Sequence, residues 1–224
     1  MTKNLCFALV AFKTLFAFAS EESASRYFAS VPQAITQIVG SVDKKPITSR
    51  EVLWYDYVET QVQHKSRQTK ITTTDVDTKS EEFISKTKKY SLAKAITLDA
   101  EQFEFPKPKN DEVQKLSQKV LKSIDALNIA EFFKPSAEEI YKLIQVKLIS
   151  EQFVKFKSQS SALPITDTDA KVYFDENKDK FANSDFESVK AQIKTQIAKA
   201  QIDARMNTWY NVLQEKYGYK DVVR

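Results

Sequence analysis

The stretch Ile35-Thr-Gln-Ile-Val-Gly-Ser-Val-Asp-Lys-Lys-Pro-Ile-Thr-Ser-Arg-Glu-Val52 carries the strongest structural signals in the chain. β-Branched side chains alternate with other residues up to Val42, which predicts a strand over residues 34–42. Residues 43–45 predict a tight turn, and Pro46 and Ile47 begin a short return strand. The segment therefore predicts a β-hairpin that leads directly into a helix.

The helix after this hairpin begins with the capping-box sequence Thr48-Ser-Arg-Glu51. In such a box the Thr48 hydroxyl accepts a hydrogen bond from the first helical turn, while the Glu51 carboxylate reaches back to the cap residue. Apolar residues at +3 and +4 spacing extend the predicted helix from about residue 49 to about residue 67. Residues 69–78 are polar and β-branched, which predicts a loop.

Five further helices follow from apolar spacing and from the positions of proline and glycine. They are expected over residues 79–102, from 110 to about 124, from 136 to before Pro164, over 167–177 and over 186–217. Their expected N-terminal caps are Asn110 or Asp111, Ser136, Asp167 or Thr168, and Ser184. Gly218 follows the longest helix, where a left-handed residue ends a helix, and residues 219–223 predict a final strand. The predicted fold is mainly α, with a small β element made from an N-terminal hairpin and a C-terminal strand.

Composition excludes several classes of function. The 224 residues include only two glycines, where average usage would give about sixteen. Glycine-rich loops that cradle phosphates are therefore excluded, both the P-loop and the dinucleotide fingerprint. The formal charge is +4, and it falls to +2 (32 basic and 30 acidic residues) without residues 1–19, which contain two lysines and no acid. This balance provides no broad cationic surface for nucleic acid or anionic lipid.

The first nineteen residues have the pattern of a secretory signal peptide. Lys3 precedes an apolar run over residues 5–12, and Ala17-Phe18-Ala19 is a small-x-small cleavage site before Ser20. Lys13 interrupts the apolar stretch, and a buried amphipathic helix is the alternative interpretation. The run is too short to span a bilayer. Cleavage after Ala19 would also remove Cys6, leaving an exported domain of residues 20–224 without thiols, in the periplasm or another extracytoplasmic compartment.

The sequence contains no recognisable catalytic constellation. His64 is the only histidine, so a multi-histidine metal site cannot form. Acidic pairs such as Glu138 and Glu139 lie at predicted helix N-termini, where the helix dipole already favours negative charge. We therefore expect no enzyme, no metal and no cofactor; an enzyme with an unrecognised lysine or carboxylate site is the remaining rival.

Aromatic residues are the distinctive feature, with fifteen Phe, nine Tyr and two Trp. Most must lie in the core, because aromatic side chains bury large areas. Some are in excess of the residues that the apolar faces of the predicted helices need for packing. Such residues can form exposed apolar patches, which mark partner sites. The predicted client-binding residues are Phe103, Phe105, Phe132, Phe133, Phe153 and Phe156.

Three segments resemble a known family in sequence and in order. The opening stretch of residues 35–52 resembles the start of the extracytoplasmic foldases SurA, PrsA and PpiD. Residues 165–181, Ile-Thr-Asp-Thr-Asp-Ala-Lys-Val-Tyr-Phe-Asp-Glu-Asn-Lys-Asp-Lys-Phe, are similar to the segment that precedes the family's parvulin isomerase domain. Residues 185–193 resemble the start of the helix that follows that domain. Only four residues separate Phe181 from Phe186, so the isomerase domain itself is missing.

The resemblance implies a SurA N-terminal-like chaperone domain without prolyl isomerase activity. In that family the first hairpin pairs with the C-terminal strand, which here would join Ile38–Val42 with Asp221–Val223. The implied function is an ATP-independent holdase for unfolded or nascent exported polypeptides such as outer-membrane proteins. The alternative is a scaffold that uses the same fold to bind one specific target; the sequence does not decide whether the chain is a monomer or a homodimer.

Overall fold

The computed structural model describes residues 36–63, 77–127, 129–181 and 184–221. The predicted signal peptide, Cys6, His64, most of the predicted 69–78 loop and residues 222–224 lie outside these ranges. Within them the protein is mainly helical with one small antiparallel sheet, which confirms the predicted class. The elements are β1 (Ile38–Val42), β2 (Lys45–Thr48), α2 (Ser49–Val62), α3 (Glu81–Gln102), α4 (Asn110–Asp125), α5 (Ala137–Ser160), α6 (Asp167–Glu176), α7 (Phe186–Tyr217) and β3 (Lys220–Asp221), with short 3-10 helices at Glu131–Phe133 and Lys178–Phe181.

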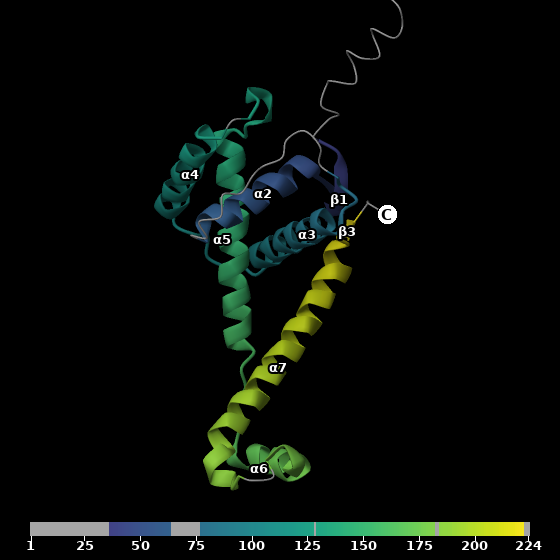
Figure 1. The fold of residues 1–224 in the computed structure, drawn as a ribbon, viewed down its shortest axis with the longest axis vertical. Helices are drawn as coiled ribbons and strands as arrows, with labels where there is room; N and C mark the ends of the chain where they lie inside the picture. The colour runs from purple at the N-terminus through teal and green to yellow at the C-terminus, as the bar shows by residue number, and fades with distance from the viewer. Residues whose placement is uncertain (1–35, 64–76, 128, 182–183, 222–224) are drawn as a thin grey trace, which may run out of the picture. The chain divides into compact units, whose positions relative to one another are not determined.

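The sheet has the strand order β2-β1-β3, and both pairings are antiparallel. Asp43 and Lys44 form the hairpin turn with φ values of 49° and 62°, the left-handed conformation that two-residue hairpin loops require. Gly40 pairs with Asp221 and Ser41 with Lys220, so the C-terminal strand adds to the first hairpin (Figure 1). The Asp43 backbone N–H also donates to the Tyr217 carbonyl at 2.7 Å, which ties the end of α7 to the turn.

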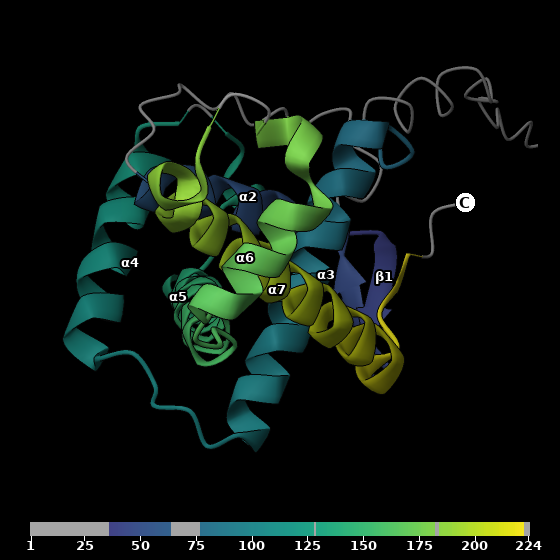
Figure 2. The same ribbon diagram turned by 90° about the horizontal axis from the view of Figure 1, so that it is seen from below.

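The hydrophobic core lies where α5 crosses α2, α3 and α4. Figure 2 looks along α5 and shows α4 on one side and α3 on the other. The whole apolar stripe of α5 is buried, from Ile140 and Ile144 (both 0% exposed) to Phe153 (0%). The helix starts at the predicted Ser136–Glu139 capping box, and both reciprocal hydrogen bonds of that box are present.

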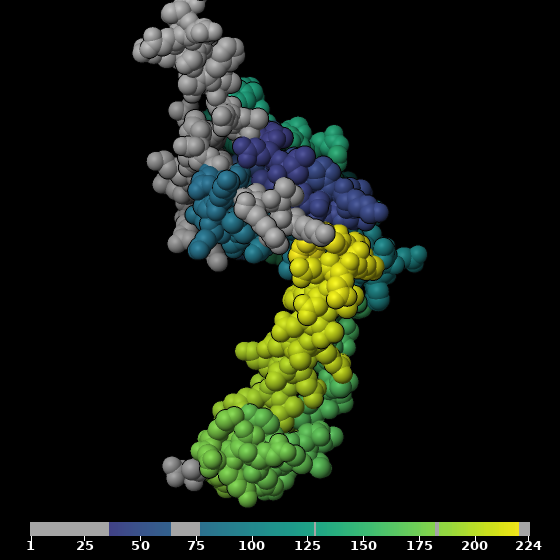
Figure 3. Space-filling view, turned by 90° about the vertical axis from the view of Figure 1, so that its right-hand side faces the viewer, coloured from purple at the N-terminus to yellow at the C-terminus, as the bar shows by residue number. Residues whose placement is uncertain are grey.

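The region formed by α6 and the N-terminal half of α7 packs differently. α6 lies against α7 at the end of that helix opposite the sheet (Figures 1 and 3). Among the described residues from 161 to 205, only Ala170 and Ile193 are buried. The apolar residues of this half of α7 keep helical spacing, but a single neighbouring helix covers little of the stripe. Just beyond this half, the Arg205 guanidinium donates a hydrogen bond to the Ser161 carbonyl at 3.0 Å, which links the middle of α7 to the end of α5.

Three predicted helix caps were wrong by one or two residues. Lys109 is the cap residue of α4, and Asn110 Oδ1 instead accepts a hydrogen bond from the Tyr141 hydroxyl at 2.7 Å. Thr166 caps α6, and Asp185 caps α7. A cap residue must be extended and must directly precede the first helical residue, and neighbouring Ser, Thr and Asp residues compete for that role at α6 and α7. At α4 the cap position is held by Lys109 without a side-chain cap hydrogen bond, and Asn110 is already the first helical residue.

The end of α7 was predicted correctly, since the helix ends at Tyr217 and Gly218 adopts the left-handed conformation. No helix in the described ranges combines the length and the apolar character that a membrane crossing needs.

Candidate functional site

Four of the six predicted phenylalanines meet in one place. Phe103, Phe105, Phe153 and Phe156 pack together with Trp209, which meets Phe153; the ring centroids of the six contacting pairs lie between 5.0 and 6.0 Å apart. We call these five residues the aromatic cluster. It joins the C-terminal end of α3, the second half of α5 and the C-terminal half of α7.

The end of α3 turns two of these rings toward α5. The Glu104 N–H donates to the Glu101 carbonyl at 3.1 Å and the Phe105 N–H to the Ala100 carbonyl at 2.9 Å, the pair of bonds that defines a Schellman motif. Glu104 has a φ of 53°, in the position where glycine is usual. This reversal ends the helix and sets Phe103 and Phe105 on the two sides of a tight turn, both within ring contact of Phe153.

The aromatic cluster is half covered. Phe153 is fully buried and Phe105 is half-buried, whereas Phe103 is 55% exposed and Phe156 37% exposed. Phe153 meets Trp209 edge to face at 5.7 Å. Two rings are therefore presented to solvent on top of two rings that cannot move without disturbing the core.

A cation lies over the aromatic cluster. The Lys157 ammonium is 5.0 Å from the ring centre of Phe103, 5.3 Å from that of Phe153 and 5.6 Å from that of Trp209. Such contacts are attractive because the ring faces carry negative charge. The exposed aromatic surface thus has a positively charged edge.

Asp99 fixes Trp209 in the aromatic cluster. Its carboxylate accepts hydrogen bonds from Trp209 Nε1 at 3.1 Å, from Lys216 Nζ at 2.7 Å and from the Tyr217 hydroxyl at 3.3 Å. Burial raises the pKa of Asp99, but the hydrogen bonds from Lys216 and Trp209 outweigh it, so the pKa lies below its ordinary value. The ionised carboxylate therefore holds three residues of α7 against α3.

The other two predicted phenylalanines lie elsewhere. Phe133 is 1% exposed and its ring packs on Trp54 at 5.4 Å, inside the core. Phe132 is 70% exposed, with no ring partner in the described part of the chain. The Arg50 guanidinium donates to the carbonyls of Phe133 at 2.9 Å and Lys134 at 2.8 Å, which holds this segment against α2.

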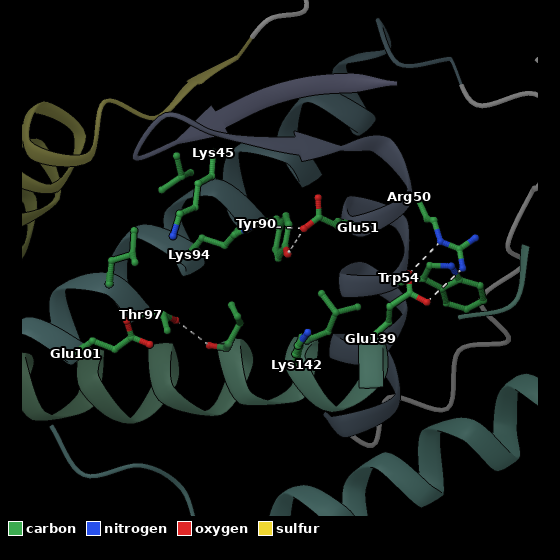
Figure 4. A pocket seen from close by; sticks show the side chains of 14 residues that line it. Lys45, Arg50, Glu51, Trp54, Tyr90, Lys94, Thr97, Glu101, Glu139 and Lys142 are labelled. Atoms are coloured by element: carbon green, nitrogen blue, oxygen red, sulfur yellow. Dashed lines mark hydrogen bonds and ion pairs between the residues drawn. The ribbon is translucent and has the colours of Figure 1, made fainter. Parts of the chain in front are cut away.

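A separate pocket of about 680 Å³ opens between the hairpin, α2, α3 and α5 (Figure 4). Glu51 lies in its wall and accepts hydrogen bonds from the Tyr90 hydroxyl and from Lys94 Nζ. Burial and the neighbouring Glu51 raise the pKa of Tyr90, so this hydroxyl stays protonated as a donor. The hydrogen bonds thus connect the start of α2 to the middle of α3.

Sequence reasoning missed Trp209, Lys157 and the pocket. Phe153, Phe156 and Lys157 follow one another at helical spacing, so a shared face could have been read from the sequence. Trp209 and the pocket join residues that are far apart in the chain, and no local pattern marks them.

The described ranges contain no group of His, Cys, Asp and Glu that could hold a metal ion. Comparisons with protein-family models, with curated proteins and with solved structures found no match for this chain.

Proposed function

We propose that this protein is an ATP-independent periplasmic chaperone that holds unfolded or partly folded exported polypeptides, outer-membrane proteins among them, without isomerising proline bonds. The observation that carries the proposal is the half-exposed aromatic cluster, with Phe103 and Phe156 at its surface. Exposed aromatic rings in contact with one another form a patch of the kind that marks polypeptide-binding sites.

The aromatic cluster suits clients of varied sequence. Contact with a client's apolar side chain buries ring surface, and each square ångström removed from water contributes about 25 cal/mol. Two exposed rings supply a weak contact that reverses readily. Because the rings behind them are already packed, little order is lost on binding.

Each predicted phenylalanine then has a distinct part in the proposal. Phe103 and Phe156 touch the client, while Phe105 and Phe153 support them from below. Phe132 offers a second, isolated contact near the start of α5. Phe133, sealed against Trp54, acts only by keeping that segment in place.

The resemblance to extracytoplasmic foldases supports the same proposal. It implies a first hairpin extended by a C-terminal strand, and β1 pairs with both β2 and β3. A holdase needs no nucleotide, because it acts by mass action on the unfolded state that it binds. The near absence of glycine, which leaves no phosphate loop, is consistent with that mode of action.

The test is suppression of aggregation when a denatured outer-membrane protein is diluted into buffer with purified protein. We expect suppression at near-stoichiometric amounts. Phe103→Ser combined with Phe156→Ser should raise the amount needed by at least about threefold, since most of the exposed ring area is lost. Val172→Ser on α6 removes a side chain that is 51% exposed and is the matched control.

Wild-type protein that fails to suppress aggregation of several clients would refute the chaperone proposal. If the double variant suppresses aggregation as well as the wild-type protein does, the aromatic cluster is not the client-binding site. Capture of one stoichiometric partner, in place of a range of unfolded chains, would favour a dedicated scaffold.

A further inference from the structure

The pocket between the hairpin, α2, α3 and α5 has the size and lining of a ligand site. Its volume of about 680 Å³ falls within the range of about 300–1,000 Å³ that holds small molecules. It shares no residue with the aromatic cluster. Its apolar lining comes from four elements and consists of Val42, Trp54, Leu98, Leu143 and Val146.

Glu51, on one wall, is already saturated with hydrogen bonds. Its Oε2 accepts from the backbone N–H of Thr48 at 2.9 Å and from the Thr48 hydroxyl at 3.0 Å. Its Oε1 accepts from the Tyr90 hydroxyl at 3.2 Å and from Lys94 Nζ at 3.3 Å. This carboxylate has no remaining capacity for a positively charged ligand.

Glu139, on the opposite wall, is satisfied in the same way. Its Oε1 lies 3.2 Å from Arg50 Nε, and its Oε2 accepts from the Ser136 backbone N–H at 2.7 Å. Glu101 is the third acidic residue of the lining; its carboxylate has no partner among the described residues, and it is exposed at the outer end of α3. The unpaired negative charge of the lining is therefore confined to its solvent-exposed end.

The positive side chains are less well satisfied. Lys94 uses one of its three N–H donors on Glu51, and the Lys45 ammonium has no hydrogen-bond or ion-pair partner among the described residues. Figure 4 shows the Lys45 side chain reaching from the hairpin toward Lys94 on α3. An ammonium group has three donors and no acceptor. These two lysines thus leave several donors unused in the lining of the pocket.

We propose that this pocket binds the carboxylate of an apolar ligand, with the anion between Lys45 and Lys94 and the apolar part against Leu143 and Val146. Charge-assisted hydrogen bonds from the two ammonium groups recognise the anion. Two sources share this chemistry: the C-terminal residue of a polypeptide and a fatty acid. The inference does not depend on the proposed chaperone function.

The test is calorimetric titration of the purified protein with two pairs of probes. One pair is acetyl-Ala-Leu-Leu with a free carboxylate and the same peptide as its C-terminal amide; the other is decanoate and decanamide. We expect one carboxylate to bind and its neutral partner to bind at least about tenfold more weakly, as for loss of hydrogen bonds to a charged group. The pair that binds identifies the source.

Variants locate the site. Lys45→Gln should weaken binding of the carboxylate by about tenfold. Lys44→Gln removes the neighbouring charge on the turn, outside the lining, and should leave the affinity unchanged. Val146→Trp fills the cavity and should abolish binding, and a thermal melt of each variant establishes that it is folded.

Three results would overturn the inference. They are no binding of either carboxylate at millimolar concentration, equal binding of the neutral analogues, and full affinity in folded Lys45→Gln and Val146→Trp proteins.

Discussion

The helices of the α2–α5 core and of the α6–α7 end have the same local sequence features, but they differ in how many neighbouring helices pack against them. α5 and α7 both begin at a side-chain cap and keep apolar residues at helical spacing. α5 has α2, α3 and α4 around it, and its stripe is buried; the first half of α7 has only α6, and Ile193 alone is buried there. Periodicity therefore predicts that a helix forms, and the number of neighbouring helices decides how much of its apolar face is covered.

Ile144→Ala should give the largest effect, because it creates a cavity in the core. Ile144 is 0% exposed on the central helix, and truncation of such a side chain costs about 3 kcal/mol. Denaturant titration should show a lower free energy of unfolding with an unchanged slope. A loss below about 1 kcal/mol would mean that the core is as loosely packed as the α6–α7 end.

Asp99→Asn tests the joint between the core and α7. The variant loses the charged partner of Lys216, so we expect a loss of about 1.5 kcal/mol. The pKa of Asp99 is lowered in the folded state, so its contribution is fully present above the unfolded value of about 4 and disappears as pH falls through the folded value.

Acid titration of wild type and Asp99→Asn by circular dichroism therefore checks the sign of this effect. The difference in stability between the two proteins should be constant near neutral pH and should shrink below about pH 4. A difference that grows on acidification would contradict the assigned charge state.

Gly218→Ala tests how α7 is joined to the sheet. Gly218 has a φ of 53°, and an added Cβ would meet nothing within 4 Å. The expected cost is therefore backbone strain alone, about 1 kcal/mol. Thermal melts should be compared for this variant and for Ser188→Ala, near the start of the same helix. A larger loss of melting temperature in Gly218→Ala identifies backbone strain at the end of α7, as opposed to a general loss of helix stability.

Ile193→Ala should give the smallest effect on global unfolding, below about 1 kcal/mol, although Ile193 is as buried as Ile144. The site has few neighbours and can collapse around the smaller side chain, and this end can open without the core. Hydrogen exchange should accelerate in residues 186–200 and stay unchanged in α5. Uniform acceleration across the chain would show that the two regions unfold as one unit.

The sequence was sufficient for several features whose deciding contacts are local, although it did not separate neighbouring candidates for three helix caps. The Thr48–Glu51 and Ser136–Glu139 boxes, the bounds of α7 and the left-handed Gly218 all depend on residues within one turn of each other. The reversal at Glu104 was not predicted, because glutamate rarely adopts positive φ and only the packing of Phe103 and Phe105 on α5 selects it.

The candidate site was only partly predictable for the same reason. The sequence showed that there are more aromatic residues than the core needs, but not which of them are exposed. Phe132 and Phe133 are adjacent, yet Phe132 is exposed and Phe133 is buried against Trp54. The pocket draws its lining from residues between Val42 and Val146. Contacts between such distant positions depend on how the helices cross, which no local pattern specifies.

The antiparallel pairing of β1 with β3 has a consequence for the order of events during biosynthesis. Helices α2 to α7 lie between the hairpin and its third strand in the sequence, so the ribosome must make all of these helices before the sheet can close. Until then the outer edge of β1 has unpaired backbone groups, a template for joining another strand. The three-stranded sheet therefore forms late in synthesis, and a translation product truncated before β3 cannot form it.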